Sequence, residues 1–200
     1  MRVLVACEFS GVVRRAFRER GHDAWSCDLI EAEDGDGHHL QRDVRDVLRD
    51  GWDLMVAHPP CTYLASMGIW WNAKRPERWP LTKAAKRFVE DLWDAPIAHV
   101  AIENPIGYLN KNWRPPTQII HPWQFGHEAS KPTCLWLRGL PILLPTQIVG
   151  KGEFYTKKNG TRMAKWSHIT SGTRKAERAR IASRTFLGIA AAMAEQWGAL

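Results

Sequence analysis

The stretch WDLMVAHPPCT, from Trp52 to Thr62, decides how the rest of the chain is interpreted. Its apolar run from Leu54 to Ala57 is long enough for a buried strand, and neither following proline could donate to a sheet ladder. The strand therefore ends by His58, and Cys61 follows on a stiff loop. Ligands of open α/β sheets bind beyond the carboxyl ends of the strands, so this position favours a reactive thiol. The alternative is a small buried side chain, the usual state of a free cysteine.

The composition is that of an ordinary globular protein, with 44% hydrophobic and 24% charged residues over a length of 200. We expect one domain over residues 1–200, in which the proline-rich, basic region 107–170 is a candidate for a small subdomain. No apolar run approaches the roughly 18 residues of a membrane span, and the apolar start is too short for a secretory signal. A cytoplasmic protein without a membrane partner is predicted. The four cysteines lack CxxC spacing, so neither a metal site nor a disulfide framework is expected.

The positive charge is concentrated near the C-terminus. Ten of the 28 lysines and arginines lie between Lys151 and Arg184, against two glutamates. Such a patch is the usual electrostatic footprint of a polyanion, which makes nucleic acid the expected partner, although a solvated basic face is the alternative. The candidate phosphate contacts in this patch are Lys157, Lys158, Arg162, Lys165 and Arg174.

The N-terminal third is typical of a nucleotide-binding βαβ unit. Residues 3–6 predict a buried strand, Phe9-Ser10-Gly11 a turn, and residues 12–20 a helix that Gly21 ends. The next strand ends at Asp28, where such folds place a carboxylate for ribose hydroxyls, although a single glycine is a weak signal and Asp28 could be a loop acid. A short third strand over residues 40–44 carries a second acid, Asp43. Val44, Val47 and Leu48 then give helical spacing before Gly51.

Aromatic and basic side chains follow the central strand. The segment 63–79 is expected to be a loop, and its tryptophans stand beside cations, a combination that suits bases and phosphates. An aromatic cluster packed under the loop is the alternative. The candidate nucleic-acid contacts here are Trp70, Trp71, Lys74 and Arg75.

A second strand repeats the pattern of the first stretch. After a helix over residues 80–93, residues 99–105 run from an apolar segment into Glu103-Asn104-Pro105. The following region contains short apolar runs separated by prolines, such as residues 133–137, and suggests antiparallel strands or irregular structure. The tail from residue 174 to residue 197 predicts a helix, basic first and then apolar.

The motifs stand in a fixed order, each near the end of a successive strand: Phe9-Ser10-Gly11, Asp28, Asp43, Pro59-Pro60-Cys61 and Glu103-Asn104-Pro105. This order resembles that of the cytosine carbon-5 DNA methyltransferases over roughly residues 3 to 110. The resemblance implies an α/β fold with a doubly wound, mostly parallel sheet of the S-adenosylmethionine-dependent, Rossmann-like methyltransferase type. The chain departs from the family where His58 replaces glycine, and 200 residues leave little room for a target-recognition domain.

The resemblance also implies site roles. Cys61 and Glu103 would be catalytic, the thiolate adding to carbon 6 of cytosine and a protonated Glu103 acting at ring nitrogen 3. S-adenosylmethionine would be the cofactor, and the residues expected to bind it are Phe9, Ser10, Gly11, Asp28, Asp43 and Pro60. The partner would be double-stranded DNA with the target base flipped out, read loosely or with a separate specificity partner.

Three alternatives remain open from the sequence. The first is a catalytically inactive protein that keeps the fold and binds nucleic acid. The second is a methyltransferase acting on RNA or on a free pyrimidine nucleotide. The third is amino-group methylation, which is weaker because those enzymes place an aromatic residue where Cys61 stands.

Overall fold

A seven-stranded sheet forms the centre of the protein. The computed structural model describes residues 1–165, 180, 181 and 183–200. Within this sheet the strand order is β3-β2-β1-β4-β5-β7-β6, and β8 and β9 form a separate two-stranded sheet. The strands are β1 (Arg2–Ala6), β2 (Asp23–Asp28), β3 (His39–Gln41), β4 (Leu54–Ala57), β5 (His99–Pro105), β6 (Gln118–Ile120), β7 (Thr133–Arg138), β8 (Phe154–Thr156) and β9 (Arg162–Ala164).

The first five strands of the sheet are parallel, and β7 and β6 close one edge in antiparallel pairing. The chain moves outward from β1 through β2 and β3, then returns to the other side of β1 through β4 and β5. The order therefore reverses between β1 and β4, which is where doubly wound sheets open a crevice for ligands. The predicted α/β fold with a doubly wound, mostly parallel sheet is confirmed.

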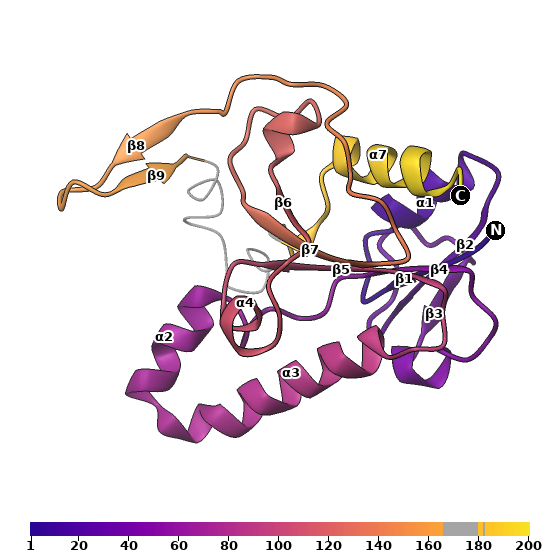
Figure 1. Cartoon of the computed structure of the whole chain (residues 1–200), viewed down its shortest axis with the longest axis horizontal. Coiled ribbons are helices and arrows are strands. Elements are labelled where there is room, and N and C mark those ends of the chain that lie inside the picture. The colour runs from indigo at the N-terminus through magenta and orange to yellow at the C-terminus, as the bar shows by residue number, and fades with distance from the viewer. Residues whose placement is uncertain (166–179, 182) are drawn as a thin grey trace.

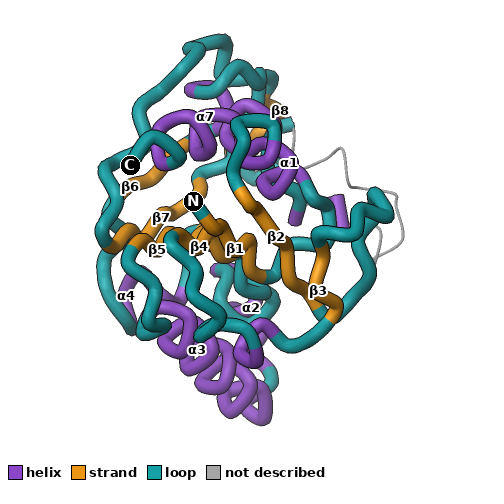
Figure 2. Tube along the Cα trace, turned by 90° about the vertical axis from the view of Figure 1, so that its right-hand side faces the viewer, coloured by secondary structure: helices purple, strands orange, loops and turns teal. Residues whose placement is uncertain are grey.

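Helices cover both faces of the sheet. α1 and α7 lie on one side, and α2, α3 and α4 lie on the other (Figures 1 and 2). The helices are α1 (Val12–Arg18), α2 (Ser66–Lys74), α3 (Trp79–Trp93), α4 (Tyr108–Asn112) and α7 (Leu187–Trp197), with short 3-10 turns η1 (Val44–Asp46), η2 (Pro76–Arg78) and η3 (Pro122–Gln124).

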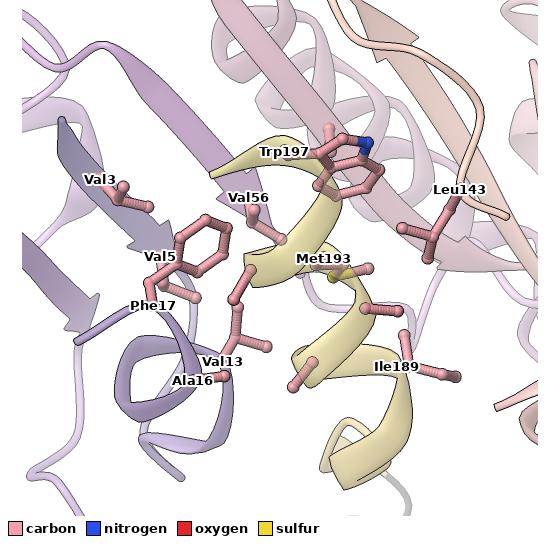
Figure 3. Close-up of a cluster of buried hydrophobic side chains, with 14 of the residues drawn as sticks. Val3, Val5, Val13, Ala16, Phe17, Val56, Leu143, Ile189, Met193 and Trp197 are labelled. Atoms are coloured by element: carbon pink, nitrogen blue, oxygen red, sulfur yellow. The ribbon is translucent and has the colours of Figure 1, made fainter. Parts of the chain in front are cut away.

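Alternate residues of each strand supply two hydrophobic clusters. Val3 and Val5 face α1 and α7, where Phe17, Met193 and Trp197 are fully buried (Figure 3). The intervening residues of β1 belong to the cluster under α3. Since apolar residues fill both faces, the strands appear in the sequence as continuous apolar runs, as parallel strands covered on both sides do.

Three local expectations differ from the structure. The third strand covers His39–Gln41, so Asp43 lies beyond its end, where its carboxylate caps η1 by accepting a hydrogen bond from the Arg45 amide. The helical spacing expected around residues 44–48 yields only the three-residue η1, because Gly51 follows at φ 77 and ends the segment. The segment expected as a loop after Cys61 contains α2.

The described part of region 107–170 contributes strands to two separate sheets. β6 and β7 belong to the main sheet, whereas β8 and β9 form a hairpin that projects from the body (Figure 1). No helix in the part of the chain that the structure describes is long and apolar enough to cross a membrane.

Candidate active site

The loop that carries Cys61 is held at both ends. His58 begins it by donating its backbone amide to the Ala6 carbonyl at 2.9 Å, and the Cys61 carbonyl accepts the amides of residues 64 and 65. Asn104 at the end of β5 donates its side-chain amide to the Pro59 carbonyl at 2.8 Å, and Asn104 is buried. The side chain of Asn104 thus fixes the proline pair against the neighbouring strand.

Cys61 and Glu103 line one cleft of about 920 Å³. They come from the carboxyl ends of β4 and β5, which are parallel neighbours with Ala57 opposite Ile102. The cleft is closed by residues from several elements, among them Ser66 of α2, Lys131 before β7, and Phe154, Arg162 and Met163 of the β8–β9 hairpin. A thiol and a carboxylate can therefore reach the same small ligand.

Glu103 is a carboxylate in this structure. Burial alone raises its pKa, but the hydrogen bond from His58 Nδ1 at 3.2 Å and the charge of Lys131 outweigh burial, so the pKa lies below its usual range. In the protein without ligand the pKa of Glu103 therefore favours the carboxylate, and partial protonation of Glu103 beside a stacked base stays a prediction. His58 and Lys131 reach Glu103 from elsewhere in the chain, so the apolar strand before Glu103 does not reveal them.

Cys61 carries its proton at neutral pH. The residue is exposed at the cleft wall, while Cys27 and Cys134 are buried and Cys7 is half-buried. Desolvation first, and the Glu103 carboxylate second, raise the pKa of the Cys61 thiol, and Lys131 opposes them. The nucleophilic form is the thiolate, so a reaction at Cys61 requires a base.

Two of the predicted cofactor acids meet beside the proline pair. Asp28, Asp43 and Pro60 line a cavity of about 170 Å³, together with Cys7 and Phe88. Desolvation raises the pKa of Asp28, whereas the hydrogen bonds from Arg45 lower that of Asp43. Asp28 and Asp43 meet because β2 and β3 are parallel neighbours, so the residues at or just after their ends lie at the same edge of the sheet.

A second depression of about 680 Å³ connects that cavity with Cys61. It shares Cys7, Asp28 and Pro60 with the smaller cavity, and Phe9 and Cys61 also line it. The Phe9 ring lies 5.4 Å from the Arg180 guanidinium. A continuous path thus runs along the carboxyl edge from Asp28 to the thiol.

The turn after β1 is organised by Glu8, a residue that the sequence analysis did not single out. The buried Glu8 carboxylate accepts the amides of Val13 and Arg14 and the hydroxyl of Ser10. Gly11 has φ 67, and a Cβ there would lie 2.4 Å from an Asp34 carboxylate oxygen. The Glu8 carboxylate therefore occupies the helix start, and the side chains of Asp34, Arg14 and Arg15 occupy the space beside Gly11. Binding of cofactor by Ser10 and Gly11 stays a prediction.

Cys7 shows a further feature that the sequence does not reveal. Its φ is 59, and among the described residues it alone adopts a positive φ without being glycine. Such a conformation is costly for a residue with a side chain and often marks a functional site. Cys7 lies at the end of β1, where the strand order of the sheet reverses, and lines both depressions near Asp28.

The predicted aromatic and basic contacts lie on α2 and at its end, and α2 begins at Ser66, which lines the cleft. Trp70 is 49% and Trp71 40% exposed, and Lys74 and Arg75 lie over their rings at 4.4 and 5.4 Å. The predicted contacts are thus displayed on a helix. The alternative of a tryptophan cluster packed under a loop does not describe these two side chains.

The basic residues of the hairpin are exposed. Arg162 lies 4.5 Å over the Phe154 ring, Lys165 pairs with Glu153 at 2.5 Å, and Lys157 and Lys158 follow β8 at the tip. Arg174 lies outside the described residues. In the ranges 1–165, 180, 181 and 183–200, no three His, Cys, Asp or Glu side chains converge as metal ligands.

Comparison with known proteins adds a distant structural likeness. No protein-family model and no curated protein matches the chain. It is similar to the crystal structure of a triple mutant of DNMT2 from Spodoptera frugiperda, with 17% identity and a TM-score of 0.45. The likeness covers 74% of this chain and 54% of that one, so the chain spans about half the length of the structure it matches. At this level the likeness says nothing about activity.

Proposed function

We propose that this chain transfers a methyl group from S-adenosylmethionine to carbon 5 of cytosine in DNA. The observation that carries the proposal is the pairing of Cys61 and Glu103 in one cleft at the ends of adjacent parallel strands. A thiol on a loop fixed by two prolines and by Asn104, opposite a carboxyl group, is the arrangement that attack on a flat ring needs.

The chemistry explains why both groups are needed. Carbon 5 of cytosine is a weak nucleophile until the Cys61 sulfur bonds to carbon 6. The carbon 5–carbon 6 π pair then shifts to carbon 4–carbon 5, and the carbon 4–nitrogen 3 π pair takes up a proton. Glu103 would pass that proton to nitrogen 3, and stabilising the developing charge at this position lowers the barrier.

The cavities fit S-adenosylmethionine. The half-buried Asp28 carboxyl, whose pKa desolvation raises, would accept hydrogen bonds from the ribose hydroxyls in the 170 Å³ cavity. Phe88 and Pro60 would enclose the adenine, and Phe9 and Cys7 line the depression that leads to Cys61. When bound, the cofactor supplies an electrophilic methyl group. We expect Asp28→Ala to weaken cofactor binding in calorimetry.

The surfaces beside the cleft support a polymer as the substrate. On one side α2 presents Trp70 and Trp71 with Lys74 and Arg75, and on the other the hairpin presents Arg162, Lys157 and Lys158. Rings that stack on bases and cations that meet phosphates suit nucleic acid, and a free nucleotide would not need them. A duplex target would have to flip its cytosine into the cleft.

We infer loose sequence reading from the same surfaces. Contacts to phosphates position a protein without reading bases, and the hairpin is small for a reading domain. A separate specificity partner would supply longer recognition.

Methyl transfer with a labelled donor tests the proposal. The full chain is incubated with labelled S-adenosylmethionine and DNA, RNA or deoxycytidine monophosphate, and the modified base is identified by mass spectrometry. We expect 5-methylcytosine in DNA, lost in Cys61→Ser while cofactor affinity is kept, since the thiol acts on the base and not on the cofactor.

Other outcomes identify the alternatives. Label found only in RNA or only in the mononucleotide would identify that molecule as the substrate in place of DNA. A methylated amino group would identify amino-group methylation in place of methylation at carbon 5. DNA binding without any label would identify a protein that keeps the fold without the activity. Bisulfite sequencing of DNA from cells expressing the active chain would then give the sequence preference.

A further inference from the structure

His58 lines one cavity with the candidate nucleophile Cys61 and another with the turn after β1. Its side chain is 8% exposed, and its Nδ1 lies 3.2 Å from Glu103 Oε2. Its Nε2 is buried and has no hydrogen-bond partner among the described residues. A buried polar atom without a partner is costly, so an unpaired Nε2 in a cleft indicates a functional role.

The partner of Nδ1 determines the tautomer. A carboxylate can only accept, and the pKa of Glu103 is held low by His58 and Lys131 against the effect of burial. Nδ1 therefore carries the hydrogen and donates it, and in a neutral imidazole this tautomer leaves the lone pair on Nε2. A carboxylate that orients an imidazole in this way prepares the far nitrogen to accept a proton.

His58 and Cys61 share both large depressions. Both residues line the 920 Å³ cleft and the 680 Å³ depression, and only two prolines separate them in sequence. The charged and titratable groups that border a cavity together with His58 are Cys7, Glu8, Asp28, Glu31, Cys61, Glu103, His121, Lys131, Lys151, Arg162 and Arg180. In this set, only His58 has both a hydrogen bond to Glu103 and a buried nitrogen without a partner that can accept a proton.

We propose that His58 is the general base that removes the thiol proton of Cys61, and that Glu103 orients His58 for this step. The inference rests on the proposed function, because the step prepares the sulfur for attack on cytosine. Catalytic hydrogen bonds tighten when substrate binds, so the contact between Nε2 and the sulfur forms with the flipped base in place.

The step balances without an outside acid or base. The sulfur–hydrogen bond breaks, the proton goes to His58 Nε2, and the sulfur electron pair forms the bond to carbon 6. The Nδ1 proton of the resulting imidazolium passes to Glu103 and from there to nitrogen 3. His58 ends neutral with its hydrogen on Nε2, and Glu103 ends as a carboxylate. This relay supplies the proton that the unprotonated Glu103 of the free protein lacks.

Trapping the covalent adduct tests the proposal. The full chain and S-adenosylmethionine are mixed with duplex DNA in which every cytosine is 5-fluorocytosine, because the fluorine prevents release of the sulfur. Adduct formation is timed between pH 6 and pH 9 on denaturing gels for wild type, His58→Gln and His22→Gln. His22 precedes β2, at the opposite end of the parallel strands from the cleft, and serves as the matched control.

We expect His58→Gln to slow adduct formation about 100-fold at pH 7, the usual contribution of a general base. Its rate should then climb with pH, because hydroxide supplies the thiolate that His58 no longer provides. His22→Gln should follow wild type, and added imidazole should restore adduct formation by His58→Gly.

Two results overturn the proposal in distinguishable ways. A wild-type pH profile in His58→Gln, or an equal loss at every pH, would remove the role of His58 and leave the proposed function standing. Failure of wild type to form any adduct would overturn the proposed function and the inference together.

Discussion

The cleft has two walls, α2, which lines it through Ser66, and the β8–β9 hairpin, and these two elements carry similar side chains on very different supports. On α2, Lys74 lies 4.4 Å over Trp70, and on the hairpin Arg162 lies 4.5 Å over Phe154. α2 begins five residues after Cys61, whereas the hairpin is joined to the body at one end of a small sheet of its own. If only the exposed side chains mattered, substitutions on α2 and on the hairpin would be expected to have the same effects.

Buried polar contacts tie α2 to the Cys61 loop. Asn72 donates to the Thr82 hydroxyl at 2.7 Å, and that hydroxyl donates to the Tyr63 carbonyl. Asn72 and Thr82 are both fully buried, and Arg78 donates to the Asn72 carbonyl oxygen. A force on α2 is thus transmitted to the backbone two residues after Cys61.

The hairpin is held by local contacts. Its tip has a backbone hydrogen bond from Lys157 to Thr161, and Lys165 pairs with Glu153 across the strands. All of these residues are exposed. The difference teaches that changes on α2 should affect the placement of the nucleophile, while changes on the hairpin should affect affinity alone.

The largest effect is expected from Gly68→Val on α2. A Cβ at this position would lie 2.2 Å from the Thr62 carbonyl oxygen, which is backbone and cannot move aside alone. We expect a loss of about 3 kcal/mol in the free energy of unfolding, the upper end of the usual cost of overpacking, and loss of adduct formation at Cys61.

Urea unfolding and the fluorocytosine trap measure these two quantities. Gly37→Ala is the control, since a Cβ at Gly37 meets nothing within 4 Å and its φ is not positive. A Gly68→Val protein with wild-type stability and adduct rate would show that α2 and the loop are not coupled.

A smaller effect is expected from Asn72→Ala. The substitution leaves the Thr82 hydroxyl without its buried donor and Arg78 without an acceptor, and such unpaired groups cost ~2 kcal/mol. Asn159→Ala is the matched change on the hairpin, where the exposed side chain accepts only the Thr161 amide. We expect its unfolding free energy to change by less than about 0.5 kcal/mol. Equal losses in the two variants would remove the contrast between the walls.

The dependence of stability on pH gives a further comparison, between Glu103 in the cleft and Glu153 on the hairpin. The hydrogen bond from His58 and the charge of Lys131 lower the pKa of Glu103 against burial, and the hydrogen bond from Lys165 lowers that of Glu153. The two side chains are 19% and 74% exposed. A lowered folded-state pKa contributes stability that is present above the ordinary value of 4.5 and is lost as the pH falls through the folded value.

We therefore expect wild type to lose unfolding free energy as the pH falls below about 4.5, and Glu103→Gln to flatten part of that loss. Glu153→Gln should follow the wild-type curve at 0.15 M salt, because exposed pairs are screened. Urea midpoints between pH 2 and pH 7 give the curves, and a flattened curve for Glu153→Gln would contradict the role of burial.

The smallest effect on stability is expected from Lys157→Ala with Lys158→Ala. Both side chains are exposed at the hairpin tip, so the unfolding midpoint should stay unchanged. If both contact phosphates, the slope of log affinity for DNA against log salt should become shallower by about 1.8, or 0.9 for each contact. An unchanged slope in fluorescence anisotropy would identify the tip as a solvated basic face.

Much of the fold could be predicted because parallel strands covered on both faces leave continuous apolar runs. The runs before Cys61 and before Glu103 predict β4 and β5, and the turn at Gly11 and the stop at Gly21 predict α1. α2 was missed because its tryptophans and cations do not form an apolar stripe, and its fixed position depends on Asn72 and Thr82, which pair across two helices.

The sequence by itself determined which chemical groups stand at the strand ends, because a proline or a charged residue after an apolar run ends a strand wherever the chain folds. Cys61, Glu103, Asp28 and Asp43 follow from that rule. Only the tertiary structure decided their protonation. His58 is 45 residues from Glu103 in sequence and meets it across two parallel strands. A pKa depends on the charges and donors within a few ångströms, and those neighbours are set by the packing of the sheet.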